Sequence, residues 1–219
     1  TVSDAEGNQY NTVTIGEQIW MASNLKTTRY NDGTGIPLVT NNSEWTTHRT
    51  PAYCWYDNEE ATYKNVYGAL YNWYAVNTGK LCPTGWHVPN IEEWRTLISY
   101  LGGESVAGGK LKETGTVHWA SPNTGATNET GFTALPGGYR DGLCWSMGIV
   151  AEFWSSTQSG ENAANDILLR ENIGGVLDGG NRYLMTGYSV RCLKGDAEDD
   201  ILARLLPDFR LQATAPDRP

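Results

Sequence analysis

Several residue patterns that mark enzymes and membrane proteins are missing from this 219-residue sequence. It has only three histidines and no short C-x-x-C spacing, so no zinc knuckle or redox centre can be read from it. It contains neither a Gly-x-Ser-x-Gly elbow nor a glycine-rich phosphate loop followed by Lys and Ser or Thr. No apolar run approaches the roughly 20 residues needed to cross a bilayer. We therefore assign no catalytic residues, no metal ligands and no membrane span.

The charge balance of the chain is acidic. Asp and Glu number 25 against 16 Lys and Arg, which gives a net charge of −9. Nucleic-acid phosphates need a basic surface, so we expect no nucleic-acid partner. The first ten residues are polar and carry no signal-peptide pattern. If the protein is secreted, we interpret this sequence as a mature form or an excised domain.

Turn-forming residues and aromatic residues with polar atoms dominate what is present. The chain has 9 Trp and 12 Tyr but 3 Phe, together with 25 Gly and 9 Pro. Indole N–H and phenol O–H groups can satisfy irregular backbone, and Gly and Pro mark turns. This composition predicts a loop-rich domain that is long enough for a substantial core. Four cysteines, an even number, favour an oxidising compartment.

The clearest local signal lies in residues 90–103. Asn90 can cap a helix, and Glu93 stands where its carboxylate can reach back to the backbone N–H of the cap residue. Gly102-Gly103 supplies a stop. Between them, apolar residues recur on one face of a helical period at Ile91, Trp94, Leu97, Ile98 and Leu101. The spacing predicts an amphipathic helix over 91–101.

A resemblance to a known family covers about residues 12–194. It rests on blocks in the right order: Gln18–Lys26 (QIWMASNLK), Tyr53–Asp57 (YCWYD), Tyr67–Ala75 (YGALYNWYA), residues 82–89 (CPTGWHVP), Gly131–Arg140 (GFTALPGGYR), Phe153–Thr157 (FWSST) and Tyr188–Lys194 (YSVRCLK). On these blocks the chain resembles the Fibrobacter succinogenes major paralogous domain family, which is similar in fold to C-type-lectin-like domains and formylglycine-generating enzymes. The resemblance implies an α+β fold over residues 1–194, with two helices packed on short twisted antiparallel sheets and residues 195–219 as an extension. It implies little about chemistry.

The resemblance also bears on the cysteines. It supports a disulfide between Cys82 and Cys192, because these two positions belong to its most recognisable blocks. Cys54 and Cys144 are then either a second bridge or buried thiols, and we favour thiols. Formylglycine-generating enzymes hold copper with a pair of cysteines, but a bridged Cys192 leaves Cys144 without the partner that copper would need. An enzyme on this fold is therefore the alternative to a binding domain.

Other segments carry weaker signals. Thr12–Ile15 and Gln18–Met21 alternate around Gly16-Glu17, which predicts an N-terminal hairpin. Apolar spacing predicts a second helix over 66–77. The later pattern is β, and the segments expected to be strands are 53–57, 153–156, about 164–170, 175–177 and 189–193, the last with one face buried.

Calcium is the one cofactor that we consider. Asn31-Asp32-Gly33 and the acidic group Asp57–Glu60 offer oxygen ligands. A tight turn explains the first group better, and a favourable helix N-terminus explains the second. We expect no cofactor, with structural calcium as the open alternative. His87 is interpreted as a hydrogen-bonded structural residue.

The predicted contact face lies between the FWSST and YSVRCLK blocks, in residues 158–186. The region is usually polar in the family, whereas here apolar residues, Arg and Tyr interrupt it, and Tyr and Arg often carry binding energy. The selected ligand-binding residues are Gln158, Asn162, Asn165, Leu168, Arg170, Asn172, Ile173, Asp178, Asn181, Arg182, Tyr183 and Met185. The alternative is that the apolar members simply pack the second face of a sheet.

These points favour an extracellular or cell-surface domain for ligand binding or adhesion. The expected partner is a protein or a carbohydrate, and Trp119 or Trp145 could stack on a sugar ring if exposed. An idiosyncratic stretch within a family-like frame also suggests a diversified receptor, of the kind in which a retroelement varies chosen codons of a lectin-like scaffold.

Overall fold

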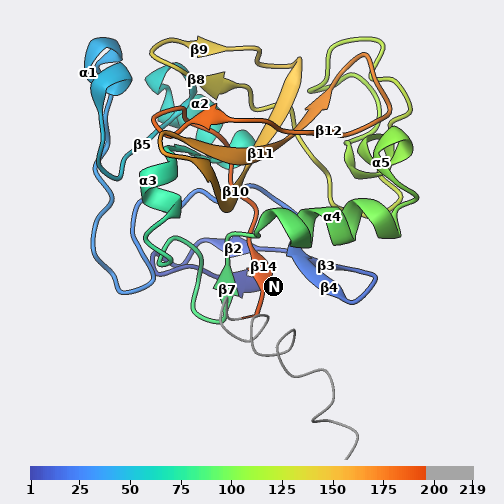
Figure 1. Ribbon diagram of the computed structural model, residues 1–219, viewed down its shortest axis with the longest axis horizontal. Helices are drawn as coiled ribbons and strands as arrows, with labels where there is room; N and C mark the ends of the chain where they lie inside the picture. The colour runs from blue at the N-terminus through green and yellow to red at the C-terminus, as the bar shows by residue number, and fades with distance from the viewer. Residues whose placement is uncertain (196–219) are drawn as a thin grey trace, which may run out of the picture.

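The computed structural model describes residues 1–195, so the expected extension lies outside the described residues, apart from Gly195. Its fold is mixed, with small antiparallel sheets and short helices (Figure 1). The helical elements are α1 (Asn42–Thr47), the 3-10 turn η1 (Tyr56–Asn58), α2 (Glu60–Tyr67), α3 (Trp73–Val76), α4 (Ile91–Tyr100) and α5 (Glu104–Leu111). The strands are β1 (Val2–Ser3), β2 (Gln9–Tyr10), β3 (Thr12–Ile15), β4 (Gln18–Met21), β5 (Tyr53–Cys54), β6 (Leu70–Tyr71), β7 (Trp86–His87), β8 (Tyr139–Arg140), β9 (Cys144–Trp145), β10 (Val150–Gly160), β11 (Ala163–Arg170), β12 (Leu177–Asp178), β13 (Arg182–Tyr183) and β14 (Leu193–Lys194).

Helix α4 lies at the centre of the fold and follows its sequence signal. The Asn90 side chain accepts a hydrogen bond from the Glu93 N–H at 3.0 Å, and the Glu93 carboxylate accepts one from the Asn90 N–H at 2.7 Å. The predicted capping box is confirmed. The apolar face of α4 packs between two four-stranded sheets, β3-β4-β14-β7 and β10-β11 with β12 and β13 (Figure 1).

The N-terminal hairpin and the disulfide are also confirmed. Strands β3 and β4 pair around a turn at Gly16, and β14 continues the sheet beside β4. Cys82 and Cys192 form a disulfide that closes a loop with a sequence separation of 110 residues. It ties the segment before α4 to the segment before β14. Cys54 and Cys144 are free thiols, as favoured.

The predicted helix over 66–77 is wrong. Gly68 has φ 75°, and a Cβ there would lie 2.6 Å from the backbone oxygen of Leu25, so the chain leaves the helical conformation at this close approach. Helix α2 therefore ends at Tyr67, and Leu70–Tyr71 pairs with Tyr53–Cys54 as a strand. Helix α3 then begins at a new cap, because the Asn72 side chain accepts a hydrogen bond from the Ala75 N–H.

Three other expectations need correction. The strand over 53–57 ends at Cys54, and η1 follows. The strand expected over 189–193 is reduced to β14 (Leu193–Lys194), and residues 189–193 are buried on both sides rather than one, since Ser189, Arg191 and Leu193 are as inaccessible as their neighbours. Residues 102–130 bury Leu111 and Trp119 and contain α5, which brings the described helices to more than two.

Three buried cations bind the loops of the fold outside the cavity described below, and we call this part of the domain the frame. Arg191 is 1 % exposed and donates to the Asn24 side chain and to the carbonyls of Met21, Phe132 and Thr133. Lys112 is fully buried and donates to the carbonyls of Thr124, Arg170 and Ile173, each at 2.9 Å. Arg140 is 1 % exposed and binds the backbone oxygens of Val39, Thr40 and Gly142. Each cation satisfies carbonyls that the irregular loops leave unpaired.

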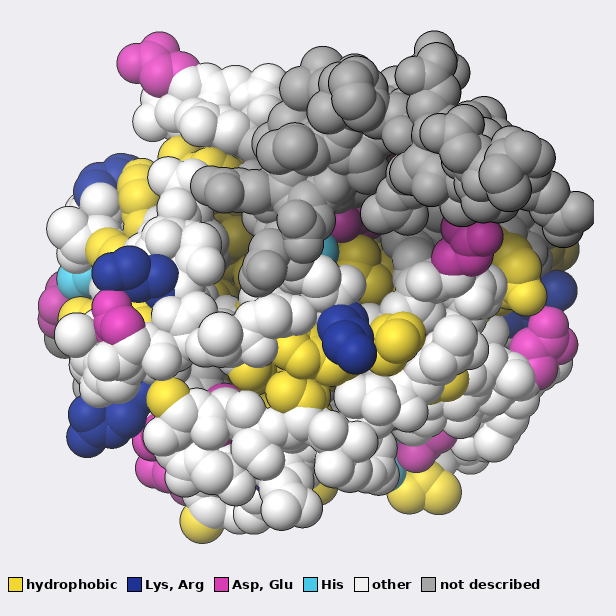
Figure 2. All heavy atoms as spheres, turned by 90° about the horizontal axis from the view of Figure 1, so that it is seen from below, with side chains coloured by type: hydrophobic (Ala, Val, Ile, Leu, Met, Phe, Trp, Pro, Cys, Tyr) yellow, Lys and Arg dark blue, Asp and Glu magenta, His cyan; other side chains and the backbone are white. Residues whose placement is uncertain are grey.

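Within residues 1–195, no helix has the length and apolar character needed to span a membrane. On the face seen in Figure 2, apolar side chains gather near the centre, and acidic side chains are scattered rather than clustered. The acidic side chains seen on this face therefore form no single patch.

Candidate ligand-binding site

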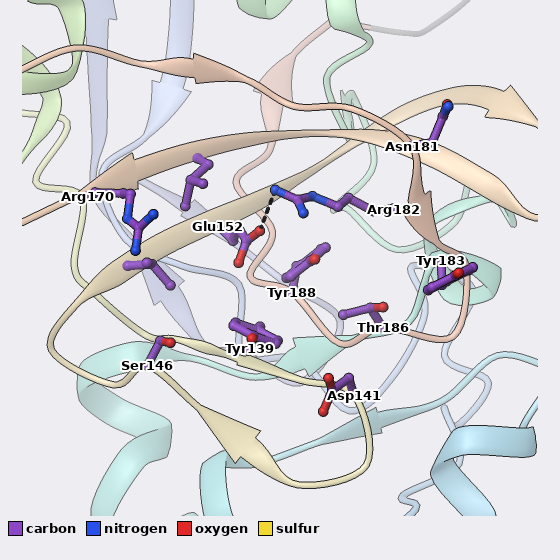
Figure 3. A pocket seen from close by; sticks show the side chains of 12 residues that line it. Tyr139, Asp141, Ser146, Glu152, Arg170, Asn181, Arg182, Tyr183, Thr186 and Tyr188 are labelled. Carbon is purple, nitrogen blue, oxygen red and sulfur yellow. Dashed lines mark ion pairs between the residues drawn. The ribbon is translucent and has the colours of Figure 1, made fainter. Parts of the chain in front are cut away.

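The β10–β11 hairpin has one face in the core and one face that borders a cavity. Phe153 pairs with Ile167, and both point into the core beside α4. The next pair in register, Glu152 with Leu168, points to the opposite face. Here the β8–β9 hairpin and residues 181–188 enclose a cavity of about 410 Å³ instead of packing tightly (Figure 3). Its lining consists of Tyr139, Asp141, Ser146, Val150, Glu152, Leu168, Arg170, Asn181, Arg182, Tyr183, Thr186 and Tyr188.

The cavity walls are fixed to the frame by backbone and aromatic contacts. Arg140 and Gly187 exchange backbone hydrogen bonds of 3.0 and 2.7 Å, which join the β8–β9 hairpin to residues 186–188. The rings of Trp154 and Tyr188 lie 4.6 Å apart, edge to face. Lys112 fixes the end of β11 through the Arg170 carbonyl. The cavity is therefore a preformed feature of the fold.

Two buried carboxylates share one arginine at the floor of the cavity. Arg182 Nη2 lies 3.2 Å from Glu152 Oε1, and Arg182 Nε lies 3.1 Å from Asp166 Oδ1. The side chains of Glu152 and Asp166 are 5 % and 0 % exposed, whereas that of Arg182 is 36 % exposed. Neither Asp166 oxygen has an aligned hydrogen-bond donor among the described residues. The buried negative charge is thus only partly compensated.

Burial shifts the titration of this group. It raises the pKa of Glu152 to about 8, and the neighbouring Asp166 charge adds to the rise while Arg182 opposes it. Burial also raises the pKa of Asp166, and Arg182 again opposes the shift. At neutral pH, Glu152 therefore keeps its proton in a large fraction of molecules, and Asp166 is the natural ionic partner of Arg182.

Aromatic and polar side chains form the walls. The rings of Tyr139 and Tyr188 lie 6.0 Å apart beside Glu152 (Figure 3). Tyr183, which is 68 % exposed, stands at the end opposite Arg170. Asp141 accepts a hydrogen bond from the indole of Trp145 at 2.8 Å and holds that exposed ring at the mouth. The arrangement suits a ligand with both hydrogen-bonding groups and an apolar part.

The structure brings some of the selected residues together and disperses others. Those that line the cavity are Leu168, Arg170, Asn181, Arg182 and Tyr183. Gln158, Asn162 and Asn172 are exposed outside the lining, and Ile173 and Met185 are partly buried. The Asn165 amide donates to the Gly179 carbonyl at 3.3 Å. The side chain of Asp178 lies outside the described part of the chain.

Several lining residues were not selected from the sequence. Tyr139, Asp141 and Ser146 come from the β8–β9 hairpin, and Glu152 comes from β10. The sequence does carry a signal for Glu152, because a lone acidic residue interrupts the apolar run of Val150–Trp154. Asp166 interrupts the facing strand in the same way. Such residues in a buried strand need a partner or a function.

The structure also bears on the two tryptophans, on His87 and on the possible metal ligands. Trp119 is 1 % exposed and donates to the Ala134 carbonyl, so it packs in the core and is not available to a sugar, whereas Trp145 is 48 % exposed. His87 is hydrogen-bonded, as interpreted, to Glu93 and to the Gly195 carbonyl. Asp32 accepts from the Thr34 N–H, as the turn requires. Among the described residues, no three His, Cys, Asp or Glu side chains gather in a way that could hold a metal.

A family model agrees with the blocks noted in the sequence. Residues 13–194 match the model described as the Fibrobacter succinogenes major domain. The chain belongs to this family. The matched region of this Fibrobacter succinogenes major domain contains the disulfide, α4 and the whole cavity. Comparison with curated proteins and comparison with solved structures gave no significant match.

Proposed function

We propose that this Fibrobacter succinogenes major domain is an extracellular or cell-surface domain for ligand binding or adhesion, without enzymatic activity, on a C-type-lectin-like scaffold. The observation that carries the proposal is the cavity on the second face of the β10–β11 hairpin. Residues from 168–188 line it on one side, and the separate β8–β9 hairpin lines the other. A preformed cavity with a few polar groups among aromatic walls is the usual form of a binding site.

The frame supports this division of roles. The disulfide and the buried cations hold the core beside α4, while the cavity-lining side chains at 170, 181 and 183 are exposed and make few packing contacts. Exposed positions of this kind tolerate substitution because little of the core depends on them. The proposal therefore includes a diversified receptor, in which a retroelement varies codons within 158–186.

The binding proposal can be tested with the complete chain. It is immobilised and offered a glycan array and a random-peptide phage library, and binders are retested on two variants. Tyr183 and Tyr100 are 68 % and 66 % exposed, and only Tyr183 lines the cavity, so Tyr183→Asp and Tyr100→Asp form a matched pair. We expect Tyr183→Asp to abolish binding and Tyr100→Asp to retain it. Binders indifferent to Tyr183→Asp would contradict the proposal.

The diversification part has its own test. Sequencing the locus across a natural population is expected to show substitutions that concentrate in 158–186 and spare 82–98 and 188–194. If 158–186 is as constant as 82–98, the domain is not a diversified receptor, although it can still bind one fixed ligand.

A further inference from the structure

The rim of the cavity carries exposed apolar side chains. They are Trp145, Leu177 and Tyr183, with exposed fractions of 48, 44 and 68 %. Leu177 pairs with the lining residue Leu168, so it lies on the cavity face of its sheet. Trp145 pairs across its hairpin with the lining residue Tyr139. Aromatic and leucine side chains around a polar centre are typical of a surface that docks a protein.

The polar centre of this surface holds two buried acids and one arginine. Glu152 and Asp166 are buried together and share Arg182 as their ionic partner. Asp141 adds a carboxylate at the mouth, where it holds Trp145. Arg170 also lines the cavity, but its side chain is exposed and lies at the end away from Tyr183 (Figure 3). A cation that enters beside Glu152 would therefore balance the carboxylate that forms when this buried acid loses its proton.

The walls beside Glu152 suit the same kind of group. Tyr139 and Tyr188 flank the Glu152 carboxyl (Figure 3). Tyrosine rings attract an ammonium or guanidinium group through their negative faces, and they also pack against an aliphatic stem. Lysine and arginine side chains combine both parts. The chain's net charge of −9 favours encounter with a basic partner.

We propose, resting on the binding function above, that the cavity receives a lysine or arginine side chain of a partner protein, with its charged head beside Glu152 and its stem against the rings of Tyr139 and Tyr188. The rim then contacts the partner surface around that side chain. On entry, the Glu152 carboxyl releases its proton to solvent, and the resulting carboxylate pairs with the incoming cation, so charge balances in the site. No covalent bond forms or breaks except this O–H bond.

The proton release gives the proposal a specific signature. The titratable groups that face Glu152 are Asp166 from β11, Arg182 from β13, Tyr139 from β8 and Tyr188. The pKa of Glu152 is raised to about 8, chiefly by burial. The carboxylate form is scarce at pH 6 and dominant at pH 9, whereas a lysine ammonium stays charged throughout. Affinity for a basic side chain is therefore expected to rise at least about tenfold between these pH values.

The test uses the complete, ¹⁵N-labelled chain with small probes. Nα-acetyl-lysine methylamide and the arginine equivalent present the cation, and Nα-acetyl-norleucine methylamide is the neutral control with a similar stem. Spermidine represents a free polyamine, and a methyl glycoside represents a neutral sugar. Amide shifts of Glu152, Leu168 and Tyr183 report on the cavity, and Ile98 in α4 reports on the rest of the fold. Titrations are run at pH 6, 7.5 and 9.

Three variants separate the charge of the site from its shape. Glu152→Gln keeps the size of the side chain and is expected to weaken lysine binding at pH 9 about tenfold and to remove the pH dependence. Asp141→Asn, at the mouth, serves if the first variant does not fold, and it is expected to weaken binding about threefold while the pH dependence remains. Trp145→Ser is expected to weaken a lysine-containing peptide but not the capped lysine.

Each possible result of these titrations supports or contradicts the proposal. Cation binding that rises with pH and is lost in Glu152→Gln supports the proposal. If norleucine or the sugar occupies the cavity as well as lysine does, the inference is wrong while the binding function stands. If spermidine binds more tightly than both capped amino acids, the occupant is a free polyamine and the protein-partner inference is overturned. If none of these small probes shifts the cavity amides although peptides selected from the library do, the inference is wrong and the proposed binding function stands. If the selected peptides also bind outside the cavity, both the inference and the proposed binding function are wrong.

Discussion

The frame and the cavity of this domain treat buried charge in opposite ways. In the frame, Arg191, Arg140 and Lys112 are buried cations, and each is surrounded by neutral oxygens of loops that need donors. In the cavity, Glu152 and Asp166 are buried acids that share the partly exposed Arg182. The buried cations satisfy the backbone, whereas the two buried acids have one cation between them.

This difference indicates that the buried charges of the frame stabilise the fold, whereas those of the cavity serve the proposed binding function. A buried cation that donates to several carbonyls is hard to replace, because its loss leaves each carbonyl unpaired. A buried acid beside a cavity can be satisfied from outside by a ligand. We therefore expect substitutions in the frame to change stability, and substitutions in the cavity to change binding and pH dependence.

Reduction of the Cys82–Cys192 disulfide should give the largest effect and would break the frame and the cavity together. The bridge closes a loop with a sequence separation of 110 residues, and in the chain-entropy model such a loop contributes about 4–5 kcal/mol to the free energy of unfolding. Urea unfolding with and without reductant measures the loss. The Cys54→Ala/Cys144→Ala variant is the control, because it keeps this bridge and is expected to lose as much on reduction as the parent protein. A loss below about 1 kcal/mol would contradict the role assigned to the bridge.

Arg191→Met tests the frame alone. It leaves the acceptors on Asn24, Met21, Phe132 and Thr133 without their donor, so we expect a loss of at least about 3 kcal/mol in the free energy of unfolding. Arg170→Met, an equal change of side chain on the exposed end of the cavity, is expected to cost less than about 0.5 kcal/mol. Urea unfolding compares the two. Equal losses would remove the distinction between the regions.

Glu152→Gln tests the cavity through pH. Because the pKa of folded Glu152 is raised to about 8, the folded protein binds an extra proton between the ordinary glutamate pKa and that value. The stability that this group contributes is present at low pH and is lost as pH rises through about 8. Relative to Glu152→Gln, the parent protein should lose up to about 1.4 kcal/mol per pH unit in that window. Unfolding at pH 5, 6.5 and 8 measures the difference, and parallel profiles would show that Glu152 is ionised in the folded protein.

The smallest expected effect tests whether a charge on the rim of the cavity changes the affinity for the lysine probe. Arg170→Glu removes a like charge from the rim of the cavity, so the lysine probe should bind roughly two- to fivefold more tightly, as expected for an exposed pair. Arg95→Glu on α4 makes the same change in net charge away from the cavity lining. Titration at low and at 0.5 M salt, compared between the variants, separates the effect of the charge at the rim from that of the net charge. An equal gain from Arg95→Glu would show that only the net charge matters.

Local sequence determined the elements whose stabilising contacts lie nearby in the chain. Asn90 and Glu93 cap α4 across three residues, and Gly16 turns the first hairpin, so both could be predicted from residue order. The family blocks pointed to Cys82 and Cys192 and to the region that supplies Arg170, Arg182 and Tyr183 to the cavity.

Tertiary structure decided the rest. The helical spacing over 66–77 was overridden because Gly68 passes against Leu25, a contact between residues distant in sequence. The segment 189–193 is buried on both sides because Arg191 finds its acceptors in loops far along the chain. The cavity itself requires the β8–β9 hairpin to lie over the β10–β11 hairpin, and only the folded chain brings Glu152, Asp166 and Arg182 together. Periodicity records which side chains share a face, but it does not record what covers that face.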